Sequence, residues 1–303
     1  INAAILSRDS IFIYNINIQC LLANQTELEY HLEQHRPHIV TLQETWLDAS
    51  IEDVDIKGYV VVSRRDRRST DRLTCGSKCG GILTLRRDDF NCLVHIQNSD
   101  SEERSWHFLR VQLETILLIN WYRSPSVIHD HFEQLYKEMS SFFHDATGVL
   151  MIGDLNIHHK KWLRFSNADT TMGTELKTFC DFHGFFQIVR EPTRKEYLLD
   201  LAITDIPKST ATVLPLIADH NAVLVKLPLP EVLEKSFTRT VWDLRKAEWS
   251  AIEHELIVFD WSALCQGTAE DSLSYFLEVL WNVLIKHIPR KDIVSRKSTH
   301  PWL

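Results

Sequence analysis

The stretch Val149-Leu150-Met151-Ile152-Gly153-Asp154-Leu155-Asn156 is an apolar run of four residues that ends abruptly in polar ones. A short apolar run followed by a turn residue such as Gly153 is typical of a strand that is buried on both faces. Asp154 and Asn156 would then stand at the end of a buried strand. This stretch therefore predicts a layered α/β protein with polar side chains at one edge of a sheet.

The same pattern recurs along the chain, because other apolar runs also end in an acid, an amide or an imidazole. The further positions are Asn15 after residues 11–14, Glu44 after 39–42, Asp200 within 198–204, and Asp219-His220 after 213–217. Each position alone is more often a turn with a side-chain cap. Five of them are hard to assign to turn chemistry, and strand ends of a sandwich share a rim. We therefore expect these groups to converge.

Residues 1–228 alternate between short strands and helices, which predicts a two-layered β core flanked by helices. The expected helices span about 24–34, 129–143 and 174–183, and the further expected strands 59–63, 81–85, 108–113, 116–122, 185–189 and 222–227. Pro228-Leu229-Pro230 marks a boundary. Residues 229–303 then predict a helical linker with helices near 244–257 and 270–287, and its tryptophans favour core packing over base stacking.

The composition is that of an ordinary globular protein, with 44% hydrophobic and 24% charged residues. No apolar run reaches the ~18 residues that a membrane span needs. Six scattered cysteines predict a reducing compartment rather than a disulfide framework. The net charge of −8 argues against sequence-blind coating of nucleic acid. It does not exclude an enzyme that holds a metal with acidic residues.

The residue types at the strand ends fit the hydrolysis of a phosphodiester. Glu44 is a hard oxygen ligand of the kind that Mg²⁺ takes in small number. His220 can transfer a proton near neutral pH, and a buried aspartate can fix its tautomer. Asparagine donates to phosphate oxygens without adding negative charge. The sequence contains no G-x-S-x-G motif and no G-x-x-x-x-G-K phosphate loop.

Six motifs occur in a recognisable order. They are Tyr14-Asn15-Ile16-Asn17, Leu42-Gln43-Glu44-Thr45-Trp46, Trp121-Tyr122-Arg123, Gly153-Asp154-Leu155-Asn156, Leu199-Asp200-Leu201 and Ala218-Asp219-His220. This set resembles the endonuclease/exonuclease/phosphatase superfamily over about residues 5–228. The resemblance implies a four-layer α/β/β/α sandwich of two packed mixed β-sheets flanked by helices.

Finer details resemble the apurinic/apyrimidinic-like endonuclease domain of non-LTR (LINE-type) retrotransposons. These details include Tyr122-Arg123-Ser124-Pro125, Pro192-Thr193-Arg194 and the tail motif His300-Pro301-Trp302. The resemblance implies a DNA endonuclease that nicks its target and leaves a 3′-hydroxyl to prime reverse transcription. It implies a double-stranded DNA target, element RNA bound through a polymerase that lies outside this sequence, no membrane, and nuclear localisation.

On the metal side, the resemblance implies that Glu44 binds Mg²⁺, with Mn²⁺ as the alternative ion. Asn15 would stand beside Glu44 and hold metal waters or phosphate, and Asp219 would support the same side. Asn17 stands where the repair enzymes commonly have aspartate, and we place it among the substrate contacts. Arg123 belongs to the same substrate set.

On the catalytic side, the resemblance implies that Tyr122 hydrogen-bonds the scissile phosphate. Asp154 would either activate water or protonate the leaving oxygen. Asn156 would orient the water or phosphate, Asp200 would orient His220, and His220 would act as acid, base or phosphate-polarising group.

Arg67 and Arg68 lie with Arg64, Arg65 and Arg72 in a run of arginines in an expected loop. They are either a solvated loop or contacts to the DNA backbone near the cleft.

Two other functions stay open at this point. One is a phosphatase or phosphodiesterase acting on phosphate esters other than DNA. The inositol phosphatases usually carry tryptophan before Gly-Asp-x-Asn, where this chain has Ile152, and arginine after the later aspartate, where it has Leu201. The other is a decayed fragment that only binds DNA, which the complete set of catalytic residue types makes the weaker reading.

Overall fold

The computed structural model describes residues 10–66, 80–100, 102–112, 114–125, 132–229, 236–265 and 268–296. The chain divides into two compact units, one formed by residues 1–235 with 296–303 and the other by residues 236–295. Among the described residues, no helix is both long and apolar enough to cross a membrane.

The described strands of the first unit form two mixed sheets. The first sheet contains β1 (Ser10–Asn17), β2 (Ile39–Gln43), β3 (Tyr59–Arg65), β4 (Ile82–Arg87), β11 (Thr210–Ile217) and β12 (His220–Pro228), in the order β11-β12-β1-β2-β4-β3. The second contains β5 (Leu93–Asn98), β6 (Glu103–Val111), β7 (Glu114–Tyr122), β8 (Gly148–Asp154), β9 (Phe186–Gln187) and β10 (Asp200–Thr204), in the order β5-β6-β7-β8-β10-β9.

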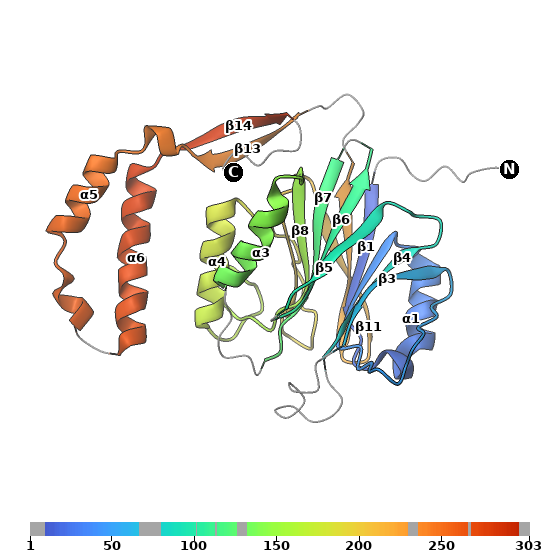
Figure 1. Ribbon diagram of the computed structural model, residues 1–303. Helices are drawn as coiled ribbons and strands as arrows, with labels where there is room; N and C mark the ends of the chain where they lie inside the picture. The colour runs from blue at the N-terminus through green and yellow to red at the C-terminus, as the bar shows by residue number, and fades with distance from the viewer. Residues whose placement is uncertain are drawn as a thin grey trace. The chain divides into compact units, whose positions relative to one another are not determined.

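Helices cover the outer faces of the two sheets, as Figure 1 shows. Helix α1 (Leu21–His35) packs its Leu28 and Leu32 against the outer side of the first sheet. Helices α3 (Phe132–Phe143) and α4 (Thr171–His183) contribute to the large core cluster of the second sheet. The expected four-layer α/β/β/α sandwich is therefore confirmed.

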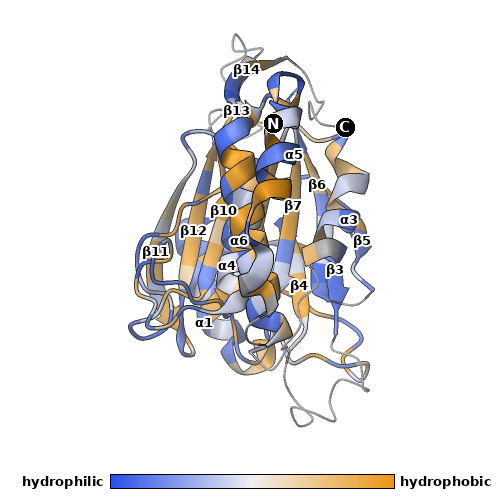
Figure 2. Cartoon of the chain, turned by 90° about the vertical axis from the view of Figure 1, so that its left-hand side faces the viewer, coloured by the Kyte–Doolittle hydropathy of each residue, from blue (hydrophilic) through white to orange (hydrophobic). Residues whose placement is uncertain are grey.

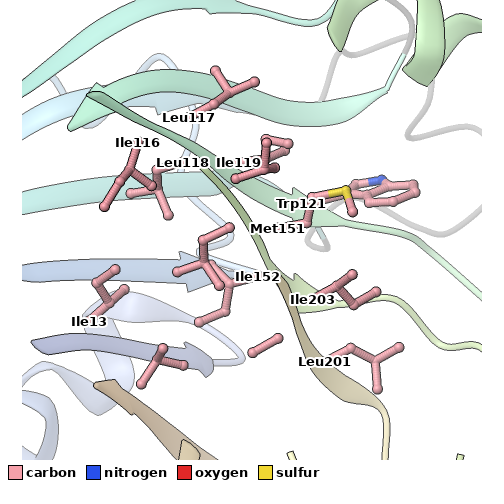
Figure 3. Packing of buried hydrophobic residues seen from close by; sticks show 14 of the residues in the cluster. Ile13, Ile116, Leu117, Leu118, Ile119, Trp121, Met151, Ile152, Leu201 and Ile203 are labelled. Atoms are coloured by element: carbon pink, nitrogen blue, oxygen red, sulfur yellow. The ribbon is translucent and has the colours of Figure 1, made fainter. Parts of the chain in front are cut away.

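The core lies between the sheets and under α3 and α4. Ile13 of the first sheet packs with residues of β7, β8 and β10, among them Ile119, Met151 and Ile203, and all four are at most 1% exposed (Figure 3). These strands carry long apolar stretches, visible in Figure 2, because they are covered on both faces. Full burial of one such side chain stabilises the fold by roughly 1.5–3 kcal/mol.

Strand direction brings the polar strand ends to one edge. β1 runs parallel to β2, and β7 runs parallel to β8, so the carboxyl ends of each pair lie together. β10 and β12 run antiparallel to β8 and β1, so their amino-terminal residues lie at those same ends. Asp200 is the register partner of Asp154.

Several element boundaries differ from those expected. Helix α1 begins at Leu21 rather than near Asn24, because the Asn24 amide donates to the carbonyls of Ile18, Gln19 and Cys20 from inside the first turn. It ends as expected before Pro37, with Arg36 in the left-handed conformation. Strand β5 was not predicted, and the strand expected at 185–189 contains only the two residues of β9.

The second unit is smaller and carries strands that the sequence did not reveal. Its elements are β13 (Ser236–Trp242), η1 (Leu244–Lys246), α5 (Trp249–Val258), η2 (Trp261–Cys265), α6 (Ala269–His287) and β14 (Arg290–Arg296). Helices α5 and α6 were expected, whereas the β13–β14 pair was not. Trp242 packs on Trp281 and under Arg290, as expected of a core residue, but Trp249 is 55% exposed.

Candidate active site

The rim formed by the ends of β1, β2, β7, β8, β10 and β12 holds most of the residues that the sequence singled out. Asn17 ends β1, Glu44 follows β2, Tyr122 ends β7 and Asp154 ends β8. Asp200 and His220 begin β10 and β12. Six segments that are distant in sequence thus meet in one place, as expected.

Gly153 has a packing reason to be glycine. A Cβ atom there would lie 1.8 Å from the carbonyl oxygen of Trp121 in the neighbouring strand, and the residue has φ +150°. Asn156 adopts the left-handed conformation, which asparagine tolerates. Its backbone N–H donates to Asp154 Oδ1 at 3.2 Å, and its Nδ2 donates to the Arg123 carbonyl at 2.9 Å. The Gly-Asp-Leu-Asn motif therefore forms a tight turn that fixes the Asp154 carboxylate.

Glu44 receives three hydrogen bonds on its carboxylate. Tyr122 Oη donates to Oε1 at 2.7 Å, and Asn17 Nδ2 donates to the same oxygen at 3.1 Å. Trp46 Nε1 donates to Oε2 at 3.2 Å. Burial and the Glu44 charge raise the pKa of Tyr122, so the phenol stays a donor. Trp46 was assigned no role from the sequence, although it lies in the quoted motif with Glu44.

Asn17 joins the two sheets at the rim. The same Nδ2 that contacts Glu44 also donates to Asp154 Oδ2 at 2.8 Å. An amide can stand between two carboxylates because it donates without adding charge. Asn17, placed in the substrate set from the sequence, thus bridges the two acids.

Asp200 and His220 form a fully buried pair. The Asp200 Oδ2 to His220 Nδ1 distance is 2.8 Å, and neither side chain is exposed. Burial lowers the pKa of His220, but the charge and hydrogen bond of Asp200, together with Asp154 and Asp219, outweigh it and raise the pKa to about 9. His220 Nε2 is buried and has no hydrogen-bond partner among the described residues. The imidazolium therefore has one N–H available for a ligand.

Asp154 is also buried, with 1% of its surface exposed. Burial, then the charge of Asp200, raise its pKa to about 7, while His220 and the Asn17 hydrogen bond oppose this rise. A carboxyl group that titrates near neutral pH is suited to proton transfer.

Asp219 lies between His220 and an arginine that the sequence did not assign. Arg194 Nε and Nη2 lie 2.8 and 2.6 Å from Asp219 Oδ2. Asp219 Oδ1 lies 3.8 Å from His220 Nε2 and has no hydrogen-bond partner among the described residues. The Pro-Thr-Arg motif was the available signal for Arg194.

Asn15 lies one layer deeper than expected. It is fully buried, and its Oδ1 accepts from Thr41 Oγ1 at 2.9 Å and from Gln43 Nε2 at 2.8 Å. The asparagine of β1 that contacts Glu44 is Asn17. Gln43 Nε2 also donates to Asn120 Oδ1 at 2.7 Å, so this amide links the first sheet to the second.

The arginines that the sequence suggested as DNA contacts lie in different surroundings. Arg67 and Arg68 lie outside the described residues. Arg123 is 5% exposed, and its backbone N–H donates to the Asp154 carbonyl at 2.9 Å. Arg64, expected in the same loop as Arg67, belongs to β3, and its guanidinium binds the carbonyls of Asp48 and Ile51.

Comparisons with known proteins agree with this fold. Residues 116–224 match the family model described as endonuclease–reverse transcriptase. No curated protein shows significant sequence similarity to the chain.

Three solved structures illustrate the similarity of fold. The AP endonuclease LMAP from Leishmania major aligns with a TM-score of 0.57 and 16% identity, covering 73% of this chain and 89% of that one. The endonuclease domain of TRAS1, a telomere-specific non-LTR retrotransposon, aligns with a TM-score of 0.56 and 15% identity, covering 73% of this chain and 100% of that one. The Xenopus laevis APE2 catalytic domain aligns with a TM-score of 0.53 and 14% identity, covering 73% of this chain and 94% of that one. The chain therefore shares the fold of these endonucleases, and its residues 116–224 match the endonuclease–reverse transcriptase family model.

Proposed function

We propose that this chain is a Mg²⁺-dependent DNA endonuclease of a non-LTR retrotransposon, which nicks one strand of duplex DNA and leaves a 3′-hydroxyl. The 3′-hydroxyl would prime reverse transcription by a polymerase outside this sequence, on element RNA and in the nucleus. The match to an endonuclease–reverse transcriptase family model and the fold shared with the TRAS1 endonuclease domain support this proposal.

One observation carries the hydrolytic part of the proposal. The buried Asp200–His220 pair leaves His220 Nε2 without a hydrogen-bond partner among the described residues, and a second buried acid, Asp154, has a pKa near 7. Two titratable groups whose pKa values are moved by burial and by each other are typical of acid–base catalysis.

Each residue has a part in this proposal. The protonated His220 donates from Nε2 to a non-bridging phosphate oxygen and offsets the charge that develops there. Asp154 either accepts a proton from the attacking water or donates a proton to the leaving 3′-oxygen. Tyr122 and Asn17 orient the Glu44 carboxylate through hydrogen bonds.

The donor set fits Mg²⁺. Among the described residues, no three His, Cys, Asp or Glu side chains gather closely enough to form a cage for a metal. Mg²⁺ needs no such cage, because it keeps several waters and takes one or two carboxylates. Glu44 would hold the ion, and Asp219 Oδ1, which has no partner in the described part of the chain, fits the supporting role expected of it. When bound, Mg²⁺ would polarise the phosphate oxygen as a Lewis acid.

The test is conversion of supercoiled plasmid to open circle by the purified chain with Mg²⁺ or with EDTA. We expect nicking with Mg²⁺ only, and a loss of about 10²–10⁴-fold in His220→Ala and Asp154→Ala, the range of general acid–base contributions. His144→Ala and Asp53→Asn alter exposed residues of the same types and should nick as the wild type does. Extension of the nick by a DNA polymerase reports the 3′-hydroxyl.

Equal rates for wild type, His220→Ala and Asp154→Ala would refute the proposal. Turnover of inositol phosphates without nicking would favour the phosphatase function. DNA binding without nicking in Mg²⁺ or Mn²⁺ would favour a decayed fragment.

A further inference from the structure

The turn before β10 fixes Arg194 to the catalytic pair. Thr193 Oγ1 accepts the backbone N–H of Asp200 at 3.0 Å, and the Thr193 carbonyl accepts that of Asn221 at 2.6 Å. A backbone bridge between Arg194 and Tyr197 closes the turn. The backbone that carries Arg194 is thus bonded to Asp200 itself and to the residue after His220.

The Arg194 guanidinium is only partly used in this structure. Nε and Nη2 contact a single oxygen, Asp219 Oδ2, and 36% of the side chain is exposed. A guanidinium has five N–H donors. Three of them therefore have no acceptor among the described residues.

The charged groups around Arg194 are acids, so an anion that enters here depends on this guanidinium. Besides Asp219, the carboxylates of Asp154 and Glu44 act on the guanidinium electrostatically. A phosphodiester that enters a rim lined by these acids needs a cation to offset repulsion. Arginine suits this task because its planar donors match two phosphate oxygens.

We propose that Arg194 is a substrate-binding residue whose guanidinium leaves Asp219 and contacts a phosphate oxygen of the bound phosphodiester. This inference rests on the proposed function in one respect, that the phosphate belongs to DNA. Asp219 then competes with the substrate for Arg194. Removing Arg194 and removing the Asp219 charge should therefore change DNA affinity in opposite directions.

The experiment measures binding of a fluorescein-labelled 20-base-pair duplex by anisotropy, in EDTA and in an Asp154→Asn background. We expect Arg194→Met to weaken binding about tenfold and to reduce the slope of log affinity against log salt by about 0.9, the value for one phosphate contact. Asp219→Asn should tighten binding severalfold. Arg194→Lys should lie between, because it keeps the charge but loses the fork.

Two neighbours provide charge-matched controls. Lys195 and Glu196 are exposed, so Lys195→Met and Glu196→Gln remove the same charges without touching the rim. If Arg194→Met equals Lys195→Met, the effect is only net charge and the proposal is wrong. If Arg194→Met and Asp219→Asn both weaken binding, Arg194 supports Asp219 structurally and the proposal is again wrong.

The outcomes separate this proposal from the nuclease function. Binding that depends on Arg194 in a chain that never nicks would leave the Arg194 assignment standing without the endonuclease. If the wild type nicks DNA but Arg194→Met binds DNA as well as Lys195→Met does, the endonuclease function would stand and the Arg194 assignment would be wrong. A wild-type chain that does not bind the duplex would refute the Arg194 assignment.

Discussion

Replacement of Asp200 by asparagine should move the alkaline limit of activity to lower pH. Asparagine keeps an oxygen that can accept the His220 Nδ1–H, but it lacks the charge. The charge and hydrogen bond of Asp200 are the largest contributions that raise the pKa of His220 to about 9 against the effect of burial. Without them burial dominates, and the pKa should fall to 6.5 or below.

The expected magnitude follows from the two pKa values. At pH 7.5 a group with a pKa of about 9 is roughly 97% protonated, whereas one with a pKa of 6.5 is about 9% protonated. If protonated His220 is the working form, Asp200→Asn should nick about tenfold more slowly at pH 7.5. The ratio of variant to wild-type rate should approach one as the pH falls to 5.5, because both forms are then mostly protonated.

The assay is initial plasmid-nicking rate from pH 5.5 to 9.5 at saturating Mg²⁺, with wild type and variant side by side. Titration of the His220 imidazole by NMR, in EDTA, gives its pKa without any reference to turnover. A rate ratio that does not change with pH, or a His220 pKa that is the same in both proteins, would refute the reasoning.

Three further outcomes are expected. Asp154→Asn should stabilise the protein by roughly 1–3 kcal/mol at pH 8 and hardly at all near pH 4, as measured by urea unfolding at both pH values. The reason is that folding raises the pKa of Asp154 from 3.8 to about 7, so the wild type loses stability as the pH rises through this range. Gly153→Ala should prevent stable folding, since its Cβ would meet a backbone oxygen at 1.8 Å, whereas Gly58→Ala meets nothing within 4 Å and should cost about 1 kcal/mol for its positive φ; equal melting temperatures would contradict this. Tyr122→Phe removes the donor to Glu44 and should lower the nicking rate about 10–100-fold, and an unchanged rate at all Mg²⁺ concentrations would argue against that contact.

The sequence was informative where one local pattern determined the structure. Apolar runs such as 149–152 are typical of strands that are buried on both faces, and the polar residues that end such strands are expected at a rim. This pattern predicts that Glu44, Asp154 and His220 lie together, and the structure places them at one rim. It could not fix which asparagine of β1 reaches Glu44, because alternate residues of a strand that share a face differ only in depth along it.

The missed features depend on contacts between distant segments. Arg194 contacts Asp219 across 25 residues, and no local pattern reports such a pair. The role of Trp46 follows from the left-handed backbone at Glu44 and at Trp46 itself, which turns the indole back onto the carboxylate. Strand β13 pairs with β14 across the whole helical part of the second unit, and the sequence between them shows only helix.

The Gln43 amide bonds Asn15 in the first sheet and Asn120 in the second, and this affects which substitutions the candidate site should tolerate. Apolar side chains in contact do not fix the relative position of two sheets strongly, because these contacts have no preferred direction. A hydrogen bond between the sheets is directional and resists their displacement. We therefore expect the position of Glu44 relative to Asp154 to depend on hydrogen bonds between the sheets in the core. Asn120 also donates across the sheets, to the Leu83 carbonyl and to Thr84 Oγ1, each at 3.1 Å. Substitutions that only repack apolar side chains should leave the site in place, whereas removing the Gln43 and Asn120 amides together should shift Glu44 relative to Asp154 while the protein still folds.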